Sequence, residues 1–74
     1  MAGNLTPRIQ AAKGFATQFG GNKVVVILLN EDAGTIECIT WGDSQHHCEE
    51  AAEIGEVLYD EAREFYRRRM RFMT

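Results

Sequence analysis

The residues best suited to chemistry lie together in Ser44-Gln45-His46-His47-Cys48, ten positions after a second cysteine, Cys38. Imidazole and thiolate are good zinc ligands, and a thiol beside a histidine at a helix start can act as a nucleophile. On a helix, however, His46 and His47 point about 100° apart and His46 and Cys48 about 200° apart, so one ion cannot bind all three. We therefore expect no metal and no cofactor, and keep a metal or thiol site at this turn as a second alternative.

The two cysteines are expected to behave as small buried apolar residues, which is the common state of a free thiol in a folded domain. His47 and Cys48 would lie at a helix start under an apolar stripe, with His46 in water. The acidic neighbours Glu49 and Glu50 disfavour a thiolate at Cys48. We therefore expect no catalytic residue here and a chain that is not an enzyme.

Five arginines occupy the last twelve residues, interleaved with aromatic side chains. Arginines grip phosphates by charge and two-point hydrogen bonding, and aromatic rings stack on bases. Cations at a helix C-terminus are also expected from the helix dipole alone. Binding of nucleic acid or a nucleotide is therefore the first alternative function, and its candidate residues are Arg63, Arg67, Arg68 and Arg71.

The acids are segregated from the bases. Residues 24–62 hold ten acids and no lysine or arginine, although the net charge of the chain is only -3. Such a block repels phosphates and favours a basic surface of another protein. This leads to the main hypothesis, a binding protein that occludes a partner protein through an acidic surface or an apolar helix face. The candidate partner-binding residues are Glu49, Glu53, Glu56, Asp60 and Trp41.

Local signals predict the elements that must position these residues. Thr6 and Pro7 suit a helix start and the pair Gly20-Gly21 a helix stop, which predicts a helix over 6–19. The apolar run Val24 to Leu29 predicts a strand over 23–30, and a loop closed by Gly34 returns the chain into a strand over 35–41. Both faces of this return strand mix apolar and polar residues, so we expect it to be the more exposed of the two.

A long helix is predicted over 44–72, capped by Asp43 or Ser44, with acids early and arginines late as the helix dipole favours. Its apolar arc covers more than half of its circumference. That is wider than a helix lying on a two-stranded ribbon can use. The predicted fold is therefore α+β: one small α-β-β-α domain over 1–74, made of an N-terminal helix, an antiparallel hairpin and a long amphipathic helix.

A chain of 74 residues builds only a small core, and a two-stranded sheet is marginal alone and leaves two open edges. We therefore expect homo-oligomerisation, most simply a dimer, to complete the fold. The candidate interface residues lie on the first strand and along the helix seam: Val25, Ile27, Ala51, Gly55, Leu58, Tyr59, Ala62, Phe65 and Tyr66. The small residues among them could instead seat the helix on its own hairpin.

The chain has no apolar run of about 18 residues and no basic-then-apolar leader, so we expect a cytoplasmic protein with no membrane partner. In its size, its charged and apolar surface and its lack of a catalytic motif it looks broadly similar to the small accessory proteins that bacteriophages and mobile elements encode. The similarity is one of style and involves no shared motif. It implies an accessory or inhibitor protein that binds a host protein.

Overall fold

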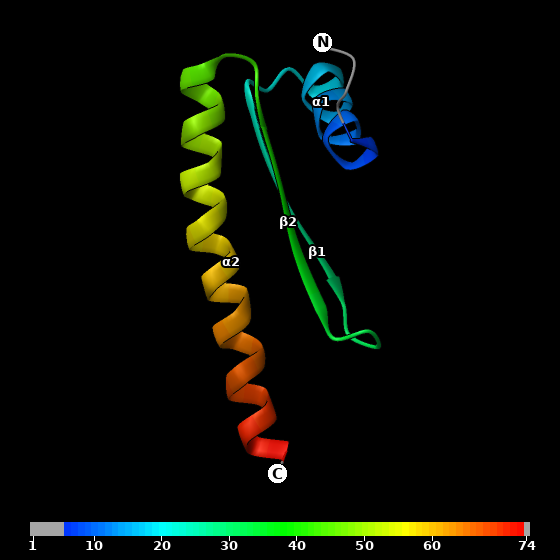
Figure 1. The fold of residues 1–74 in the computed structure, drawn as a ribbon, viewed down its shortest axis with the longest axis vertical. Helices are drawn as coiled ribbons and strands as arrows, with labels where there is room; N and C mark the ends of the chain where they lie inside the picture. The colour runs from blue at the N-terminus through cyan, green and yellow to red at the C-terminus, as the bar shows by residue number, and fades with distance from the viewer. Residues whose placement is uncertain (1–5, 74) are drawn as a thin grey trace.

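The computed structural model describes residues 6–73, and the side chains of residues 6–69. Its elements follow in the order α1 (Pro7–Phe19), β1 (Lys23–Asn30), β2 (Thr35–Gly42) and α2 (Gln45–Met73), as Figure 1 shows. The predicted α-β-β-α fold is thus confirmed, and each boundary lies within one residue of its expected place. The radius of gyration is 14.4 Å, whereas a compact domain of this length has about 11 Å, so the chain is elongated.

The ends of α1 follow from its sequence. The backbone N–H of Ile9 donates to the Thr6 hydroxyl at 3.2 Å, and Pro7 opens the first turn, where its missing N–H costs no hydrogen bond. The helix stops at Gly20, whose φ of 78° places it in the left-handed region that side chains disfavour. Both signals were expected from the sequence, and both are confirmed.

β1 and β2 form a two-stranded antiparallel sheet in which Lys23 lies opposite Gly42 and Asn30 opposite Thr35. The loop between them closes as predicted, because Gly34 has a φ of 70° and its N–H donates to the Glu31 carbonyl at 3.2 Å. The loop is further held by the Asn30 side chain, which accepts from the Ala33 N–H at 3.0 Å. This register decides which residues share each face of the hairpin.

The start of α2 resolves the choice between two caps. The Ser44 hydroxyl accepts the backbone N–H of His47 at 3.2 Å, so Ser44 is the cap residue. Asp43 contacts the His47 ring instead. Glycine is required just before this turn, since a side chain at Gly42 would overlap the backbone of His47 and Cys48.

The two helices lie on opposite faces of the hairpin, as Figure 1 shows. α1 covers one end of the first face, where Ala12 and Ala16 pack against Val24, Ile39 and Trp41. An ion pair of 2.6 Å between Arg8 Nε and Glu37 Oε1 joins the same helix to β2. α2 covers the other face along its length. The hairpin is therefore the middle layer, and only part of its α1 face is covered.

The exposure of the two strands is the reverse of the expectation. The return strand, predicted to be the more exposed, is half-buried from Ile36 to Gly42. In β1, by contrast, Val26, Leu28 and Leu29 are exposed. The prediction was wrong because it judged each strand by the polarity of its own residues, whereas the coverage depends on where α1 and α2 lie.

The buried part of the described chain is made of small residues. Ala12, Ala16, Val24 and Ala51 are its buried apolar residues, and no large side chain within the described residues is fully buried. Because burial of apolar area is the main favourable contribution to folding, such a core stabilises a lone chain only weakly. The large apolar side chains remain at the surface.

Ala51 and Gly55 seat α2 on its own hairpin. Ala51 has no exposed surface, and a methyl group at Gly55 would lie 2.7 Å from Thr40 Cγ2 and 2.9 Å from Cys38 Sγ. We expected these two residues at an interface between copies. That expectation is wrong for them, because the hairpin of the same chain already occupies their surface.

Replacing Gly55 by alanine tests this close contact. Alanine improves helix propensity by about 1 kcal/mol, but overpacking costs about 1 to 3 kcal/mol, and the short Thr40 and Cys38 side chains have little freedom to move aside. We expect Gly55→Ala to lower the free energy of unfolding by about 1 kcal/mol. The measurement is urea denaturation followed by far-ultraviolet circular dichroism at a fixed protein concentration.

Gly14→Ala is the matched control, because Gly14 lies inside α1 with no atom near the position of a new methyl group. It should raise the free energy of unfolding by about 1 kcal/mol through propensity alone. Equal stability of the two variants would show that α2 does not approach the hairpin as closely as described.

Candidate partner-binding surface on the long helix

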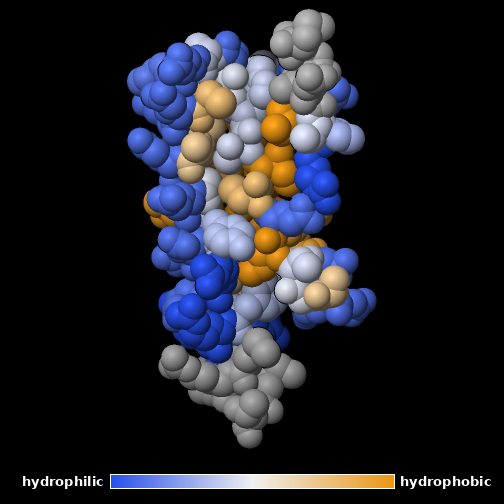
Figure 2. All heavy atoms as spheres, viewed as in Figure 1, coloured by the Kyte–Doolittle hydropathy of each residue, from blue (hydrophilic) through white to orange (hydrophobic). Residues whose placement is uncertain are grey.

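The side of α2 that faces away from the hairpin carries a line of carboxylates. We call it the acidic ridge, and it consists of Glu49, Glu53, Glu56 and Asp60. Steps of four, three and four residues keep these side chains on one side of a helix, and all four are exposed. Figure 2 shows that hydrophilic side chains gather along α2 in this view, while apolar ones gather over the hairpin.

Most of the ridge has no countercharge. Glu53, Glu56 and Asp60 make no hydrogen bond or ion pair with any described side chain, and Glu49 only accepts from the Gln45 amide at 3.2 Å. Several acids outside the ridge are paired instead: Glu37 with Arg8, Glu50 with Lys23, and Glu64 with two arginines. The ridge is therefore the aligned group of acids in which countercharges are lacking.

Glu50 joins the base of α2 to β1. Its carboxylate lies 3.0 Å from Lys23 Nζ and 3.2 Å from His46 Nε2. The hydrogen bond from Lys23 is the main reason why the pKa of Glu50 is lowered, and the nearby His46 and His47 act in the same direction. Glu50 therefore belongs to a structural contact and not to the ridge.

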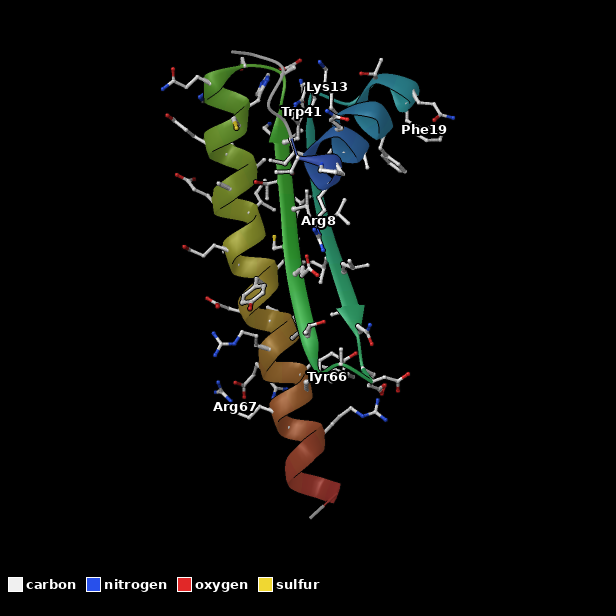
Figure 3. All side chains as sticks on the ribbon, turned by 45° about the vertical axis from the view of Figure 1, so that its right-hand side comes forward. Arg8, Lys13, Phe19, Trp41, Tyr66 and Arg67 are labelled. Atoms are coloured by element: carbon white, nitrogen blue, oxygen red, sulfur yellow. The ribbon has the colours of Figure 1, made fainter. Side chains whose placement is uncertain are left out.

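The predicted anion site is only partly free. Arg67 and Arg68 both contact the Glu64 carboxylate, at 3.0 and 3.4 Å, and the Arg63 guanidinium lies 5.8 Å from the centre of the Tyr59 ring. Figure 3 shows Arg67 directed away from the hairpin. The side chain of Arg71 lies outside the described residues. Because the acidic ridge continues directly into this arginine cluster, a phosphate backbone laid along α2 would meet repulsion over much of its length.

The His-His-Cys turn does not gather its side chains around one point. His47 Nδ1 lies 2.6 Å from Asp43 Oδ1, whereas His46 contacts Glu50. Within the described residues, no group of three or more histidine, cysteine, aspartate or glutamate side chains is placed to hold a metal ion. The turn is therefore held by two separate acid-histidine contacts.

The two thiols have different surroundings. Cys38 lies under α2, where its Sγ is 3.6 Å from the Gly55 carbonyl and burial raises its pKa. Cys48 is exposed, so the expectation that it is buried under the apolar stripe was wrong. The backbone of Cys48 lies against Gly42 at the end of β2, but its side chain is open to solvent. His47 is half-buried and His46 exposed, as expected.

Trp41 was a candidate partner-binding residue, but it packs against the core formed by α1 and β1. Figure 3 shows it between the strands and α1. Its half-buried ring covers Ala12, Ala16 and Val24. We therefore assign Trp41 a structural role in place of the expected role in partner binding.

The remaining candidate interface residues divide by exposure. Leu58 and Phe65 are exposed, whereas Val25, Ile27, Tyr59, Ala62 and Tyr66 are half-buried between α2 and the hairpin. Sequence reasoning missed exposed apolar residues elsewhere, at Phe15, Phe19, Val26, Leu28 and Ile54. For Ile54 the signal was that the apolar arc of the long helix exceeds what its hairpin can cover; for the residues of α1 and β1, exposure depends on tertiary packing and had no local signal.

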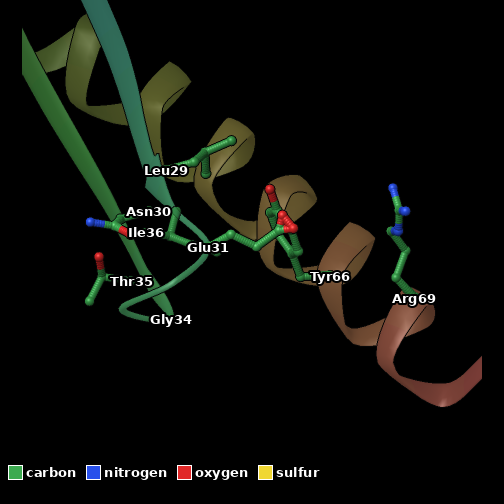
Figure 4. A pocket seen from close by; sticks show the side chains of 8 residues that line it. All are labelled: Leu29, Asn30, Glu31, Gly34, Thr35, Ile36, Tyr66 and Arg69. Atoms are coloured by element: carbon green, nitrogen blue, oxygen red, sulfur yellow. The ribbon is translucent and has the colours of Figure 1, made fainter. Parts of the chain in front are cut away.

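An open pocket of about 410 Å³ lies where α2 passes the hairpin tip. Leu29 and Ile36 come from the strands, Glu31 from the loop, and Tyr66 and Arg69 from α2. Figure 4 shows Arg69 turned away from the strands, and its guanidinium lies 5.5 Å from the centre of the Phe65 ring. Its polar lining residues are at the surface, so the pocket by itself specifies no ligand.

Thiol labelling tests the placement of the two cysteines. In the folded protein, a maleimide should modify Cys48 only, because Cys38 is covered by α2 and burial raises its pKa and disfavours its thiolate. Unfolding in urea should then add a second label. Intact-mass spectrometry counts the labels, and the Cys48→Ser variant should remain unlabelled until it unfolds. Rapid double labelling of the folded chain would contradict the packing of α2 on β2.

No helix within residues 6–73 combines the length and apolar character needed to cross a bilayer. Comparison with protein-family models, with curated proteins and with solved structures finds no match to this chain. Its function must therefore be inferred from the chemistry of its own surface.

Proposed function

We propose that this chain is a non-enzymatic, homo-oligomeric binding protein whose acidic ridge docks on a basic surface of another protein and occludes it. The observation that carries this proposal is that Glu53, Glu56 and Asp60 are exposed, aligned and without a countercharge among the described side chains. Small size and an acidic surface are in keeping with an accessory or inhibitor protein, including the kind encoded by bacteriophages.

The spacing of the ridge is unfavourable for the helix itself. Like charges four residues apart, such as Glu49/Glu53 and Glu56/Asp60, destabilise a helix by about 0.2 to 0.5 kcal/mol per pair. A lysine or arginine at any of these positions would remove the repulsion. The ridge is therefore better explained by an interaction with an external cation than by the stability of α2.

The ridge presents a simple target geometry. From Glu49 to Asp60 it extends over about 16 Å of helix axis, with a carboxylate roughly every 5 Å. A partner with a row of lysines or arginines at similar intervals, or a groove that normally receives the phosphates of nucleic acid, matches this pattern. Such complementarity accelerates association and fixes orientation, and both effects weaken with salt.

Two pairs of substitutions distinguish the ridge from charge in general. Glu56→Gln/Asp60→Asn neutralises two ridge acids, and Glu31→Gln/Asp32→Asn neutralises one glutamate and one aspartate at the hairpin loop. We expect the ridge variant to bind a basic protein partner at least about tenfold more weakly than the native chain, with little change for the loop variant.

The assay is affinity capture from a cell lysate with quantitative mass spectrometry, followed by titration of each captured basic protein at several salt concentrations. The binding constant of the native chain should fall with salt, and the ridge variant should show a shallower dependence. Equal loss for both variants would indicate non-specific attraction, and no loss for either would refute the ridge as the binding surface.

The same ridge variant should be more stable than the native chain. Removing the Glu56/Asp60 repulsion should raise the free energy of unfolding by a few tenths of a kcal/mol, about 0.2 to 0.5 kcal/mol. Urea denaturation provides the measurement. Greater stability combined with weaker binding is the result that a functional ridge predicts, whereas lower stability would mean that these acids have structural partners.

A further inference from the structure

One flank of α2 is mainly apolar and lies on the β1 side of the molecule. Ile54, Leu58 and Phe65 share this flank at steps of four and seven residues and are exposed, and the acid Glu61 lies among them. Glu50, one turn before Ile54, contacts Lys23 of β1, and this contact shows that the flank is on the β1 side of α2. The opposite flank of α2, above β2, is mainly polar and continues into the acidic ridge.

The outer edge of β1 is unpaired within the described chain. The Asp43 N–H donates to the Asn22 carbonyl, and the direction of hydrogen bonding alternates along an antiparallel strand. The N–H and C=O groups of Val25, Ile27 and Leu29 therefore point away from β2. No described segment pairs with them, since the sheet contains β1 and β2 alone.

We infer that a second copy of this chain binds at this edge. The two β1 strands pair antiparallel about a two-fold axis through Ile27, forming a sheet in the order β2-β1-β1-β2. The two α2 helices then lie antiparallel on one face, and the α1 helices lie on the other. This inference rests on the homo-oligomeric part of the proposed function, which it deepens, and is independent of the acidic ridge.

The position of the axis follows from two separate estimates. Residues opposite each other in antiparallel strands point to the same face of the sheet. An axis between two residues would pair each residue with one that points to the other face, so the axis must pass through a residue. Ile27 is central in β1. Val25 lies beside Gly55, and two strand residues equal about four helix residues in length, so Ile27 is level with residue 59 of α2. The midpoint between Ile54 and Phe65 falls at the same level.

This register brings exposed apolar residues together on both faces. On the α2 face, Val25 lies opposite Leu29 of the second copy, and Ile54 lies beside its Phe65. On the α1 face, Val26 and Leu28, which are 38% and 48% exposed, lie opposite each other. Figure 3 shows Phe19 directed away from both strands, on the β1 side, where it can cover the second copy.

The spacing of the helices is suitable for direct packing. Adjacent strands lie about 4.8 Å apart, so helices centred on neighbouring hairpins are roughly 10 Å apart, within reach of helix-helix packing. Gly55 faces residues of both strands, with its shortest contacts to β2, so α2 lies over the hairpin and the two helices are separated by somewhat more than this distance.

The charge pattern of α2 selects the antiparallel arrangement. All lysines and arginines of α2 lie at or after Arg63, and its acids, apart from Glu64, lie at or before Glu61. In the inferred dimer, the acidic half of one helix lies beside the basic half of the other, with Glu50 near Arg68 of the second copy. A parallel arrangement would instead place like charges together.

The chain exposes more surface than a monomeric protein of its mass, as a subunit of an oligomer does. The chain exposes 5945 Å², whereas a monomeric globular protein of 8.4 kDa exposes about 4,600 Å². The excess is on the order of 1,000 Å² per chain, and a standard stable interface buries roughly 800 Å² from each partner. A second copy at β1 would bury surface of this order.

The first test is the mass in solution of the native chain and two lysine variants. Light scattering after gel filtration should give twice 8.4 kDa for the native chain. Leu58→Lys should raise the dimer dissociation constant at least about tenfold, because it places a charge in the centre of the interface. Ala52→Lys is the control, since Ala52 is also exposed but lies on the opposite side of α2 from Ile54 and Leu58. Circular dichroism establishes that each variant is folded.

A cross-linking test does not depend on the stability of these variants. In a Cys48→Ser background, Leu58→Cys should form a covalent dimer with a short bis-maleimide, whereas Asp60→Cys, at nearly the same level but on the far side of α2, should not. A folded native chain that stays monomeric, equal effects of the two lysine variants, or equal cross-linking at both positions would each overturn the inference.

The two proposals fail separately. Leu58→Lys should weaken dimerisation while leaving the acidic ridge intact, and Glu56→Gln/Asp60→Asn should weaken partner binding while leaving the dimer intact. A monomer that still binds a basic protein through the ridge would overturn only the inferred dimer. A dimer that is indifferent to ridge substitutions would overturn only the docking of the ridge on a partner.

Discussion

The close approach of α2 to the hairpin at Gly55 is the contact on which the rest of the structure depends. A two-stranded sheet has little stability alone, so it must be covered, and only a residue without a side chain lets a helix lie against Thr40 and Cys38 at this distance. Ala51, one turn earlier, continues the same seam with no exposed surface. This contact fixes the rotation of α2 about its axis, and therefore decides which residues face the solvent.

A seam of small residues limits the burial of apolar surface. α1 adds only Ala12 and Ala16 to the buried set, and large apolar side chains of α1, β1 and α2 remain exposed. The same rotation directs the uncompensated acids to the outer side of α2. Around its circumference the helix thus has three strips, each running lengthwise: a buried seam, an apolar flank and the acidic ridge. Because the flank and the ridge lie on different sides, self-association and partner binding can occur together.

Ion pairs within the chain further distinguish the acidic ridge from the other charged residues. Arg8, Lys23, Arg67 and Arg68 are all engaged by acids that lie outside the ridge. These exposed ion pairs each contribute little to stability, but they leave no base paired with Glu53, Glu56 or Asp60 among the described side chains. The arginine cluster, which was a second candidate site in the sequence, is partly neutralised by Glu64. Only the distances between side chains could show that the arginine cluster is partly neutralised whereas the acidic ridge is not.

The sequence by itself determined the order, type and ends of the elements, because these depend on local features such as the Thr6 cap, the left-handed glycines Gly20 and Gly34, and the period of the apolar residues. The exposed acids of α2 were also foreseeable, since helical spacing alone places them together. Which side chains are covered by another element and which are exposed was decided by the tertiary structure. Nothing local shows that Trp41 faces α1, that Cys48 is exposed, or that β1 is more exposed than β2. The apolar arc of α2 is wider than its hairpin, so its sequence allows several rotations, and the steric fit at Gly55 selects one.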